Sequence, residues 1–143
     1  MALYHFHVDQ VKRSEGRSAV ASAAYRAGEK LHNLWDGETH DYTKKGGVVF
    51  TEIMLPPNAP ERFSDRSTLW NDLEQFEKRG DAQLAYSFDI AMQNEFTLEE
   101  NIEYARQFVR EQFLSAGMIV DFAFHLPGKD ENDIPKDQQH ETL

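Results

Sequence analysis

QLAYSFDIAM, at positions 83–92, alternates along its whole length between large apolar side chains and small or polar ones. One face of the predicted strand carries Leu84, Tyr86, Phe88, Ile90 and Met92, and the other carries Ala85, Ser87, Asp89 and Ala91. A period of two is typical of a strand that packs one face on the core. Strands of parallel sheets are buried on both faces and read as continuous apolar runs, so this stretch favours an antiparallel sheet.

The segments on either side predict three more strands and three helices. Strands are expected at residues 3–9, 48–55 and 118–126, and helices at residues 18–32, 62–79 and 98–116. Thr97 and Glu100 have the spacing of a capping box at the start of the last helix, and Gly117 suits its end. Three of the four strands alternate. We therefore predict an α+β fold, an antiparallel sheet of the ferredoxin-like kind with helices on one face and an open polar face.

The chain has 143 residues, enough for one domain, which we place at residues 1–126. Residues 127–143 are polar and contain Pro and Gly, so we expect a tail or a truncated final strand. The absence of cysteine excludes disulfides and thiolate zinc sites. The chain has no signal peptide and no apolar run of about 18 residues, so we expect a cytoplasmic protein without a membrane partner.

The charge of the chain is unevenly distributed. The net charge of −10 argues against a simple nucleic-acid binder, because Lys and Arg make most phosphate contacts. Residues 1–50 nevertheless have a net charge of +1, whereas residues 51–143 have a net charge of −11. If DNA is the partner, the first third of the chain should contact it. The alternative is an ordinary solvated acidic surface.

Polar side chains gather on the second face of the predicted sheet. The set consists of His5, His7 and Asp9 on the first strand, Ser87 and Asp89 on the third, and Asp121 and His125 on the fourth. Histidines and carboxylates that converge on a sheet can bind a divalent metal or transfer protons. Simple exposure to solvent explains the same pattern, so both interpretations stay open.

Tyr25 lies off the apolar stripe of the predicted helix 18–32. Alanines, Val20 and Leu31 fill that stripe, whereas Tyr25 falls among Ser and other polar residues. A tyrosine can act as a covalent nucleophile. Candidate phosphate contacts in its neighbourhood are Arg17, Arg26 and Lys30. The alternative is a half-exposed tyrosine that packs its ring on a neighbour.

Several motifs occur in an order that resembles the MobA/MobL relaxases. They include Tyr4-His5, Gly16-Arg17-Ser18-Ala19, Ala24-Tyr25-Arg26, and Gly117-Met118-Ile119-Val120-Asp121 leading to His125. The resemblance runs from about residue 4 to residue 135 and identifies the chain as the N-terminal part of such a protein.

The resemblance implies an enzyme that nicks DNA. Relaxases are endonucleases with a five-stranded antiparallel sheet, and their tyrosine cuts single-stranded DNA at a transfer origin through a 5′-phosphotyrosine link. By position, Tyr25 would be that nucleophile and His125 a ligand of Mg²⁺ or Mn²⁺. Asp89, or Ser87 at the usual carboxylate position, would orient a ligand histidine. Other proteins of the relaxosome are the implied protein partners.

The chain departs from the family at its metal motif. The family follows Ile-Pro with Asn-Pro-His-x-His, whereas here Ile134-Pro135 precedes Lys136-Asp137-Gln138-Gln139-His140. Gln138 takes the place of the first histidine, and His140 is left as the candidate second ligand. We therefore expect an incomplete metal site with little nicking activity. The alternatives are a non-catalytic module that binds single-stranded DNA on the same scaffold and an acidic protein-interaction domain.

Overall fold

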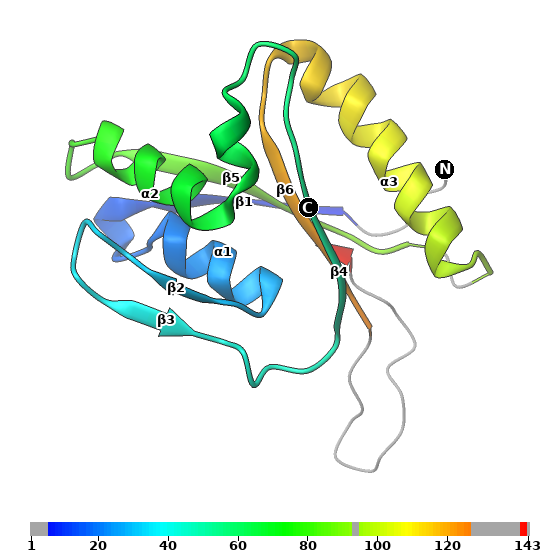
Figure 1. Ribbon diagram of the computed structural model, residues 1–143, viewed down its shortest axis with the longest axis horizontal. Coiled ribbons are helices and arrows are strands. Elements are labelled where there is room, and N and C mark those ends of the chain that lie inside the picture. The colour runs from blue at the N-terminus through cyan, green and yellow to red at the C-terminus, as the bar shows by residue number, and fades with distance from the viewer. Residues whose placement is uncertain (1–5, 93–94, 127–140, 143) are drawn as a thin grey trace.

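The computed structural model describes residues 6–92, 95–126 and 141–142. Five strands form one antiparallel sheet in the order β1-β5-β7-β6-β4 (Figure 1), which confirms the predicted antiparallel α+β class. The strands are β1 (Phe6–Lys12), β4 (Val48–Met54), β5 (Gln83–Ile90), β6 (Val120–His125) and β7 (Glu141–Thr142). A separate antiparallel pair consists of β2 (Lys30–His32) and β3 (Thr39–Asp41).

Three α-helices lie in the described ranges, namely α1 (Ala19–Ala27), α2 (Arg66–Phe76) and α3 (Leu98–Gln112). Short 3₁₀ turns lie at Arg13–Glu15, Glu61–Ser64 and Leu114–Ala116. The predicted capping box is present at α3, where Thr97 and Glu100 each accept a hydrogen bond from the other's backbone N–H. None of the helices in the described part of the chain is long and apolar enough to cross a membrane.

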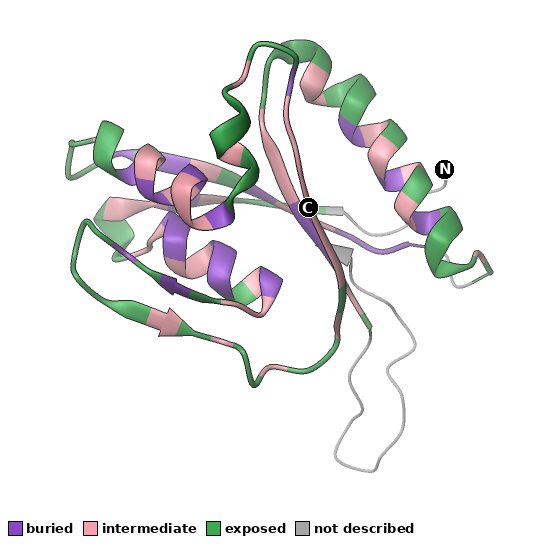
Figure 2. Cartoon of the chain, viewed as in Figure 1, coloured by how far each residue is buried: buried purple, intermediate pink, exposed green. Residues whose placement is uncertain are grey.

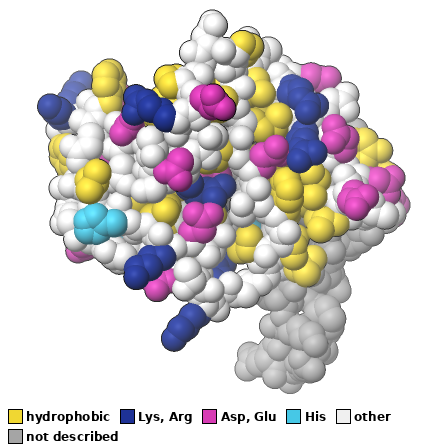
Figure 3. Space-filling model, viewed as in Figure 1, with side chains coloured by type: hydrophobic (Ala, Val, Ile, Leu, Met, Phe, Trp, Pro, Cys, Tyr) yellow, Lys and Arg dark blue, Asp and Glu magenta, His cyan; other side chains and the backbone are white. Residues whose placement is uncertain are grey.

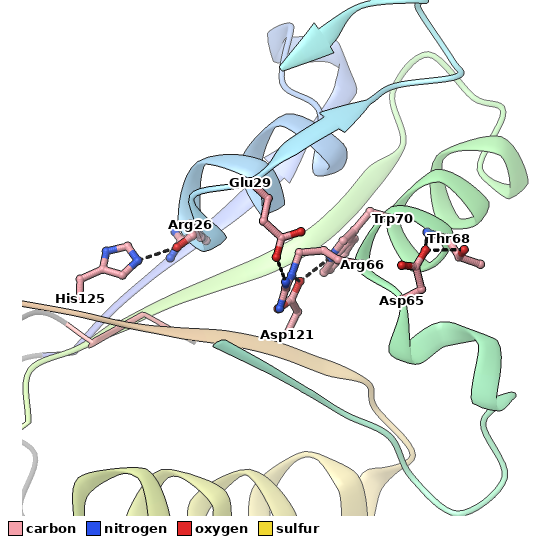
Figure 4. A network of polar contacts seen from close by, with 8 residues as sticks. All are labelled: Arg26, Glu29, Asp65, Arg66, Thr68, Trp70, Asp121 and His125. Atoms are coloured by element: carbon pink, nitrogen blue, oxygen red, sulfur yellow. Dashed lines mark hydrogen bonds and ion pairs between the residues drawn. The ribbon is translucent and has the colours of Figure 1, made fainter. Parts of the chain in front are cut away.

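Helices cover both faces of the sheet, so the prediction of helices on one face is wrong. α3 packs its Ala105 and Val109 on the aromatic face, which carries Phe122 and Phe124. α1 and α2 pack on the opposite face, where Ala19 of α1 contacts Val11. Figure 4 shows α3 on one side of β6 and the other two helices on the other side. The buried residues lie along one side of α1 and of α3 (Figure 2).

The physical reason for the second helical layer is the presence of small apolar residues on the face predicted to be open. Val11, Ala85 and Ala123 interrupt its polar residues and are buried or partly buried. Their small side chains leave room for α1, which is itself rich in alanine. Polar residues on this face therefore lie beneath α1, at the edge of a packed interface.

α1 ends earlier than the sequence predicted. Gly28 adopts the left-handed conformation with φ of 67°, and its N–H donates to the carbonyl of Ala24. A side chain there would be strained and would place a Cβ 3.3 Å from Val48 Cγ2. The chain then turns into β2, so Lys30 lies on a strand and not on the helix that carries Tyr25.

β7 is the shortest strand of the sheet and lies between β5 and β6. It pairs Thr142 with Asp89 and Ala123, and Glu141 with Ile90 and Phe124. The residues on either side of β7 lie outside the described part of the chain, so the truncated final strand stays a prediction. His140 lies outside the described residues, so its predicted ligand role stays a prediction.

Candidate functional site

The C-terminal end of α1 meets the polar residues of the sheet through Arg26. Its Nη1 lies 3.1 Å from Asp89 Oδ1, and its Nη2 donates to Ser87 Oγ. The carbonyl of the same residue accepts a hydrogen bond from His125 Nε2 at 2.7 Å (Figure 4). Of the predicted site residues, the structure therefore brings Arg26, Ser87, Asp89 and His125 together beside Tyr25.

The last carbonyls of α1 are occupied by side chains of this site. A helix leaves its final carbonyl groups without partners in the helix itself, and other donors must satisfy them. Lys45 Nζ donates to the carbonyl of Tyr25 at 2.8 Å, and His125 donates to that of Arg26. These two bonds fix the end of α1 to the β3–β4 loop and to β6.

His125 is half-buried and has the protonation state that metal binding requires. Burial lowers the pKa of its imidazole, and the charges of Lys45 and Arg26 lower it further against the opposing effects of the Arg26 carbonyl and Asp89. The neutral ring therefore persists at neutral pH. A carbonyl can only accept, so Nε2 carries the proton and Nδ1 is the nitrogen suited to a ligand.

Tyr25 is 52% exposed, and two residues of the β3–β4 region hold its ring. Tyr42 contacts it edge to face with ring centroids 5.3 Å apart. Lys45 Nζ lies 3.7 Å from the ring centroid on its face. Burial, followed by the charge of Arg26, lowers the pKa of Lys45. An exposed phenol with a lysine over its ring is suited to meeting an anionic group.

Sequence reasoning missed the roles of Lys45 and Tyr42. The segment that contains them lies between the helix predicted at residues 18–32 and the strand predicted at residues 48–55, and neither a helix nor a strand was expected there. They reach Tyr25 because β2 and β3 pair and return the chain to the end of α1.

Two predicted phosphate contacts lie elsewhere. Arg17 precedes the N-cap residue Ser18, at the end of α1 opposite to Tyr25. Its guanidinium is engaged with Asp9 and with the Gln10 carbonyl, each at 2.7 Å. Lys30 is exposed on β2, opposite Asp41. The structure therefore does not bring these two residues to the Arg26 cluster.

Asp121 lies on the face of β6 where it was expected, but α2 covers that face and Asp121 is part of a buried ion-pair network. It accepts from Arg66 Nε at 2.7 Å, from Arg66 Nη2 at 2.8 Å and from Trp70 Nε1 at 2.8 Å. Arg66 also pairs with Glu29, which directly follows Gly28 (Figure 4). The network joins β6 and α2 to the turn after α1. It therefore fixes the position of the end of α1 relative to β6.

One group of side chains in the described part of the chain has its ligand atoms close enough together to hold a metal ion. The ligand atoms of Asp36, Glu38 and His40, on the β2–β3 hairpin, all lie within 4.8 Å of one another. This triad does not include His125, the ligand expected from the sequence. Its two acidic members are exposed.

Charges are mixed over the surface of the protein. On the face seen in Figure 3, acidic and basic side chains are interspersed. The cations at the end of α1 are therefore a local feature of the site within an acidic chain.

Comparison with known proteins gives consistent matches. The model of the MobA/MobL family matches residues 17–141. The conjugal transfer protein TraA of Rhizobium radiobacter is 42% identical over 135 residues, which make up 87% of this chain and 12% of TraA. The mobilization protein MobL of Acidithiobacillus ferridurans is 39% identical over 145 residues, with 99% of this chain and 38% of MobL covered. The chain thus spans well under half of the length of either relative.

A solved structure is similar over nearly the whole chain. It comes from the work "Molecular Basis of Vancomycin Resistance Transfer in Staphylococcus aureus" and is 33% identical, with a TM-score of 0.80. The match covers 94% of this chain and 76% of that chain.

Proposed function

Since the chain belongs to the MobA/MobL family, we propose that it is the relaxase domain of a DNA-mobilisation protein, in which Tyr25 forms a covalent link with single-stranded transfer-origin DNA. One observation carries the proposal. His125, the candidate metal ligand, is hydrogen-bonded to the backbone of Arg26, the residue next to Tyr25. The nucleophile and the metal ligand are therefore tied to the same turn of α1.

The reaction is a transesterification at phosphorus. The Tyr25 phenol oxygen forms a bond to the phosphorus of a phosphodiester, and the bond from phosphorus to the 3′ oxygen breaks. The phenol loses its proton and the departing oxygen gains one, so a 3′-hydroxyl and a 5′-phosphotyrosine result. Exposure of Tyr25 gives the phosphate access, and its contacts with Tyr42 and Lys45 restrict the ring to one orientation.

His125 would hold a divalent cation, Mg²⁺ or Mn²⁺, with His140 as a second ligand. When bound, the ion would offset charge on the phosphate oxygens. The neutral imidazole fits a ligand role, and the carbonyl that holds Nε2 sets the direction of Nδ1. Asp89 and Ser87 both contact Arg26, so they would orient His125 through that residue.

The DNA would approach over the end of α1. Arg26 and Lys45 are the cations next to Tyr25 there and would contact its phosphates. The remainder of the chain, with its excess of acids beyond residue 50, would face protein partners of the relaxosome.

Lys45→Met is expected to weaken binding of a single-stranded origin oligonucleotide by about tenfold at low salt. The ammonium would be lost from the face of Tyr25, and one fewer counterion would be released on binding, so the salt slope should fall by about 1. Fluorescence anisotropy at several salt concentrations measures both quantities. Lys44→Met removes an equal charge from the exposed neighbouring lysine and is the matched control. Equal losses in the two variants would contradict a specific role for Lys45.

The test of the proposed function is covalent attachment to labelled origin oligonucleotides. With Mn²⁺, the native chain should bind the ion weakly and give little adduct, because Gln138 stands where the family pattern has a histidine. The triple variant Lys136→Asn, Asp137→Pro, Gln138→His restores the family pattern together with His140. It should give a covalent adduct that survives denaturing gel electrophoresis. Binding without any adduct in the restored variant would favour a non-catalytic DNA-binding module.

A further inference from the structure

The turn of the β2–β3 hairpin carries side chains of two types that bind metal ions. Asp36, Glu38 and His40 occupy every second position, and their ligand atoms all lie within 4.8 Å of one another. His40 pairs with Leu31 of β2, and paired residues of an antiparallel ladder point to the same face. Leu31 is only 6% exposed and packs with residues of α1. The imidazole of His40 therefore lies on the side of the hairpin that faces α1.

His40 has a buried ring nitrogen that lacks a polar partner. Its Nε2 forms no hydrogen bond with any residue that the structure describes. Two other histidines differ in this respect. His32 Nδ1 lies 2.8 Å from Thr39 Oγ1, and His125 Nε2 donates to the carbonyl of Arg26. A buried polar atom without a partner costs free energy, and an ion at that nitrogen would remove the cost.

The two carboxylates of the turn carry negative charge that no nearby cation offsets. Within the described ranges, neither Asp36 nor Glu38 takes part in an ion pair. Carboxylates this close together repel each other, and a divalent cation between them would offset that repulsion.

The backbone of the turn is already held in place. Asn33 is only 1% exposed and donates its N–H to the carbonyl of Glu38 at 2.8 Å. Its own carbonyl accepts from the N–H of Gly37 at 2.8 Å. The N–H of Leu34 donates to Asn71 Oδ1 of α2 at 2.8 Å. An ion would thus need to order side chains only, which reduces the entropic cost of binding.

We propose that this turn binds a divalent first-row transition ion, at a site separate from the one proposed at His125. One imidazole nitrogen and two carboxylate oxygens suit Zn²⁺ or a similar ion better than Mg²⁺ or Ca²⁺, which prefer oxygen ligands alone. Water would complete the coordination, since the two acids are exposed. The chain enters β2 shortly after α1 ends, so the turn lies at the opposite end of the hairpin from that helix end (Figure 1).

The ion would stabilise the hairpin in its closed form. Each strand has three residues, and a two-stranded ribbon is at best marginally stable on its own. Asp36 belongs to the turn and His40 to β3, so a bound ion would link the two. Tyr42 directly follows β3, and its N–H donates to the carbonyl of Glu29 at 3.1 Å. The site would therefore stabilise the segment that holds Tyr42 against Tyr25.

Calorimetric titration with Zn²⁺ tests the site in a full-length parent that carries His125→Gln and His140→Gln. These changes remove the ligands proposed for the relaxase ion, so failure of that proposal does not affect the result. One Zn²⁺ should still bind, and Mg²⁺ should bind far more weakly. Adding His40→Gln should weaken Zn²⁺ binding at least about tenfold, since even changes around a ligand cost that much. The matched control His32→Gln alters an exposed histidine of the same hairpin and should leave the affinity unchanged.

A second variant and a second measurement locate the ion. Glu38→Gln keeps the shape of an exposed side chain and should also weaken Zn²⁺ binding. With Zn²⁺ at about ten times its Kd, amide exchange at Asn33 and Gly37 should slow about tenfold in the parent and not in the His40→Gln variant. Absence of a bound ion in the parent, or an equal loss of affinity from His40→Gln and His32→Gln, would overturn the proposal.

Discussion

Tyr25→Phe is expected to lower the yield of covalent protein–DNA adduct by at least about a thousandfold in the motif-restored chain. The substitution removes the oxygen that would bond to phosphorus and leaves the ring between Tyr42 and Lys45. DNA affinity should stay within a few-fold of the parent, because the neighbouring cations remain. Denaturing gels of labelled oligonucleotide measure the adduct, and anisotropy measures the binding.

Tyr42→Phe is the matched control for this experiment. Tyr42 lies 5.3 Å from Tyr25 between ring centroids and belongs to the same cluster, so the variant makes an equal chemical change beside the site. It should keep most of the adduct yield. An undiminished yield from Tyr25→Phe, or equal losses from both variants, would rule out Tyr25 as the nucleophile.

Asp121→Ala is expected to reduce the free energy of unfolding by about 3–5 kcal/mol. Arg66 is only 8% exposed and would keep its charge after losing a bidentate partner. Burial on its own would lower the pKa of Arg66, but the hydrogen bonds and charge of Asp121 raise it, so the guanidinium stays ionised. Trp70 Nε1 would lose its acceptor as well. Urea denaturation followed by tryptophan fluorescence measures the change.

Asp72→Ala provides the comparison for the buried network. Asp72 pairs with Arg62 at the surface, where an ion pair contributes less than about 1 kcal/mol. The double variant Asp121→Leu, Arg66→Met should recover a large part of the lost stability, because no buried charge is then left without a partner. A loss from Asp121→Ala as small as that from Asp72→Ala would show that the network does not stabilise the fold.

The fold class was predictable because β5 shows its alternation directly in the sequence. The second layer of helices was not, because Ala85 and Ala123 were assigned to a polar face by their position in the alternation. An alanine occurs both at exposed positions and in close contacts with a helix. The residue type alone therefore does not show whether a helix covers that face. The end of α1 was missed for a related reason, since Gly28 stands in a window of good helix formers.

The candidate site was predictable in part. Tyr25, Ser87, Asp89 and His125 were identified before the structure, and they do lie around the end of α1. Arg26 was expected to hold phosphate, but its guanidinium also joins α1 to β5. The Arg66–Asp121 pair, 55 residues apart in sequence, was missed because nothing local in the sequence relates its two members. Contacts of that kind follow from topology.

The hydrogen bonds at the end of α1 would compete with a bound phosphate for Lys45. The carbonyl end of a helix carries partial negative charge, which attracts the ammonium of Lys45 and the ring N–H of His125. A phosphate that binds the ammonium of Lys45 must break its hydrogen bond to the carbonyl of Tyr25. Its net affinity is then the difference between two electrostatic attractions, and release of the helix end would loosen the turn that orients Tyr25. Rigidity of the proposed nucleophile Tyr25 and affinity for a phosphate are thus opposed through Lys45.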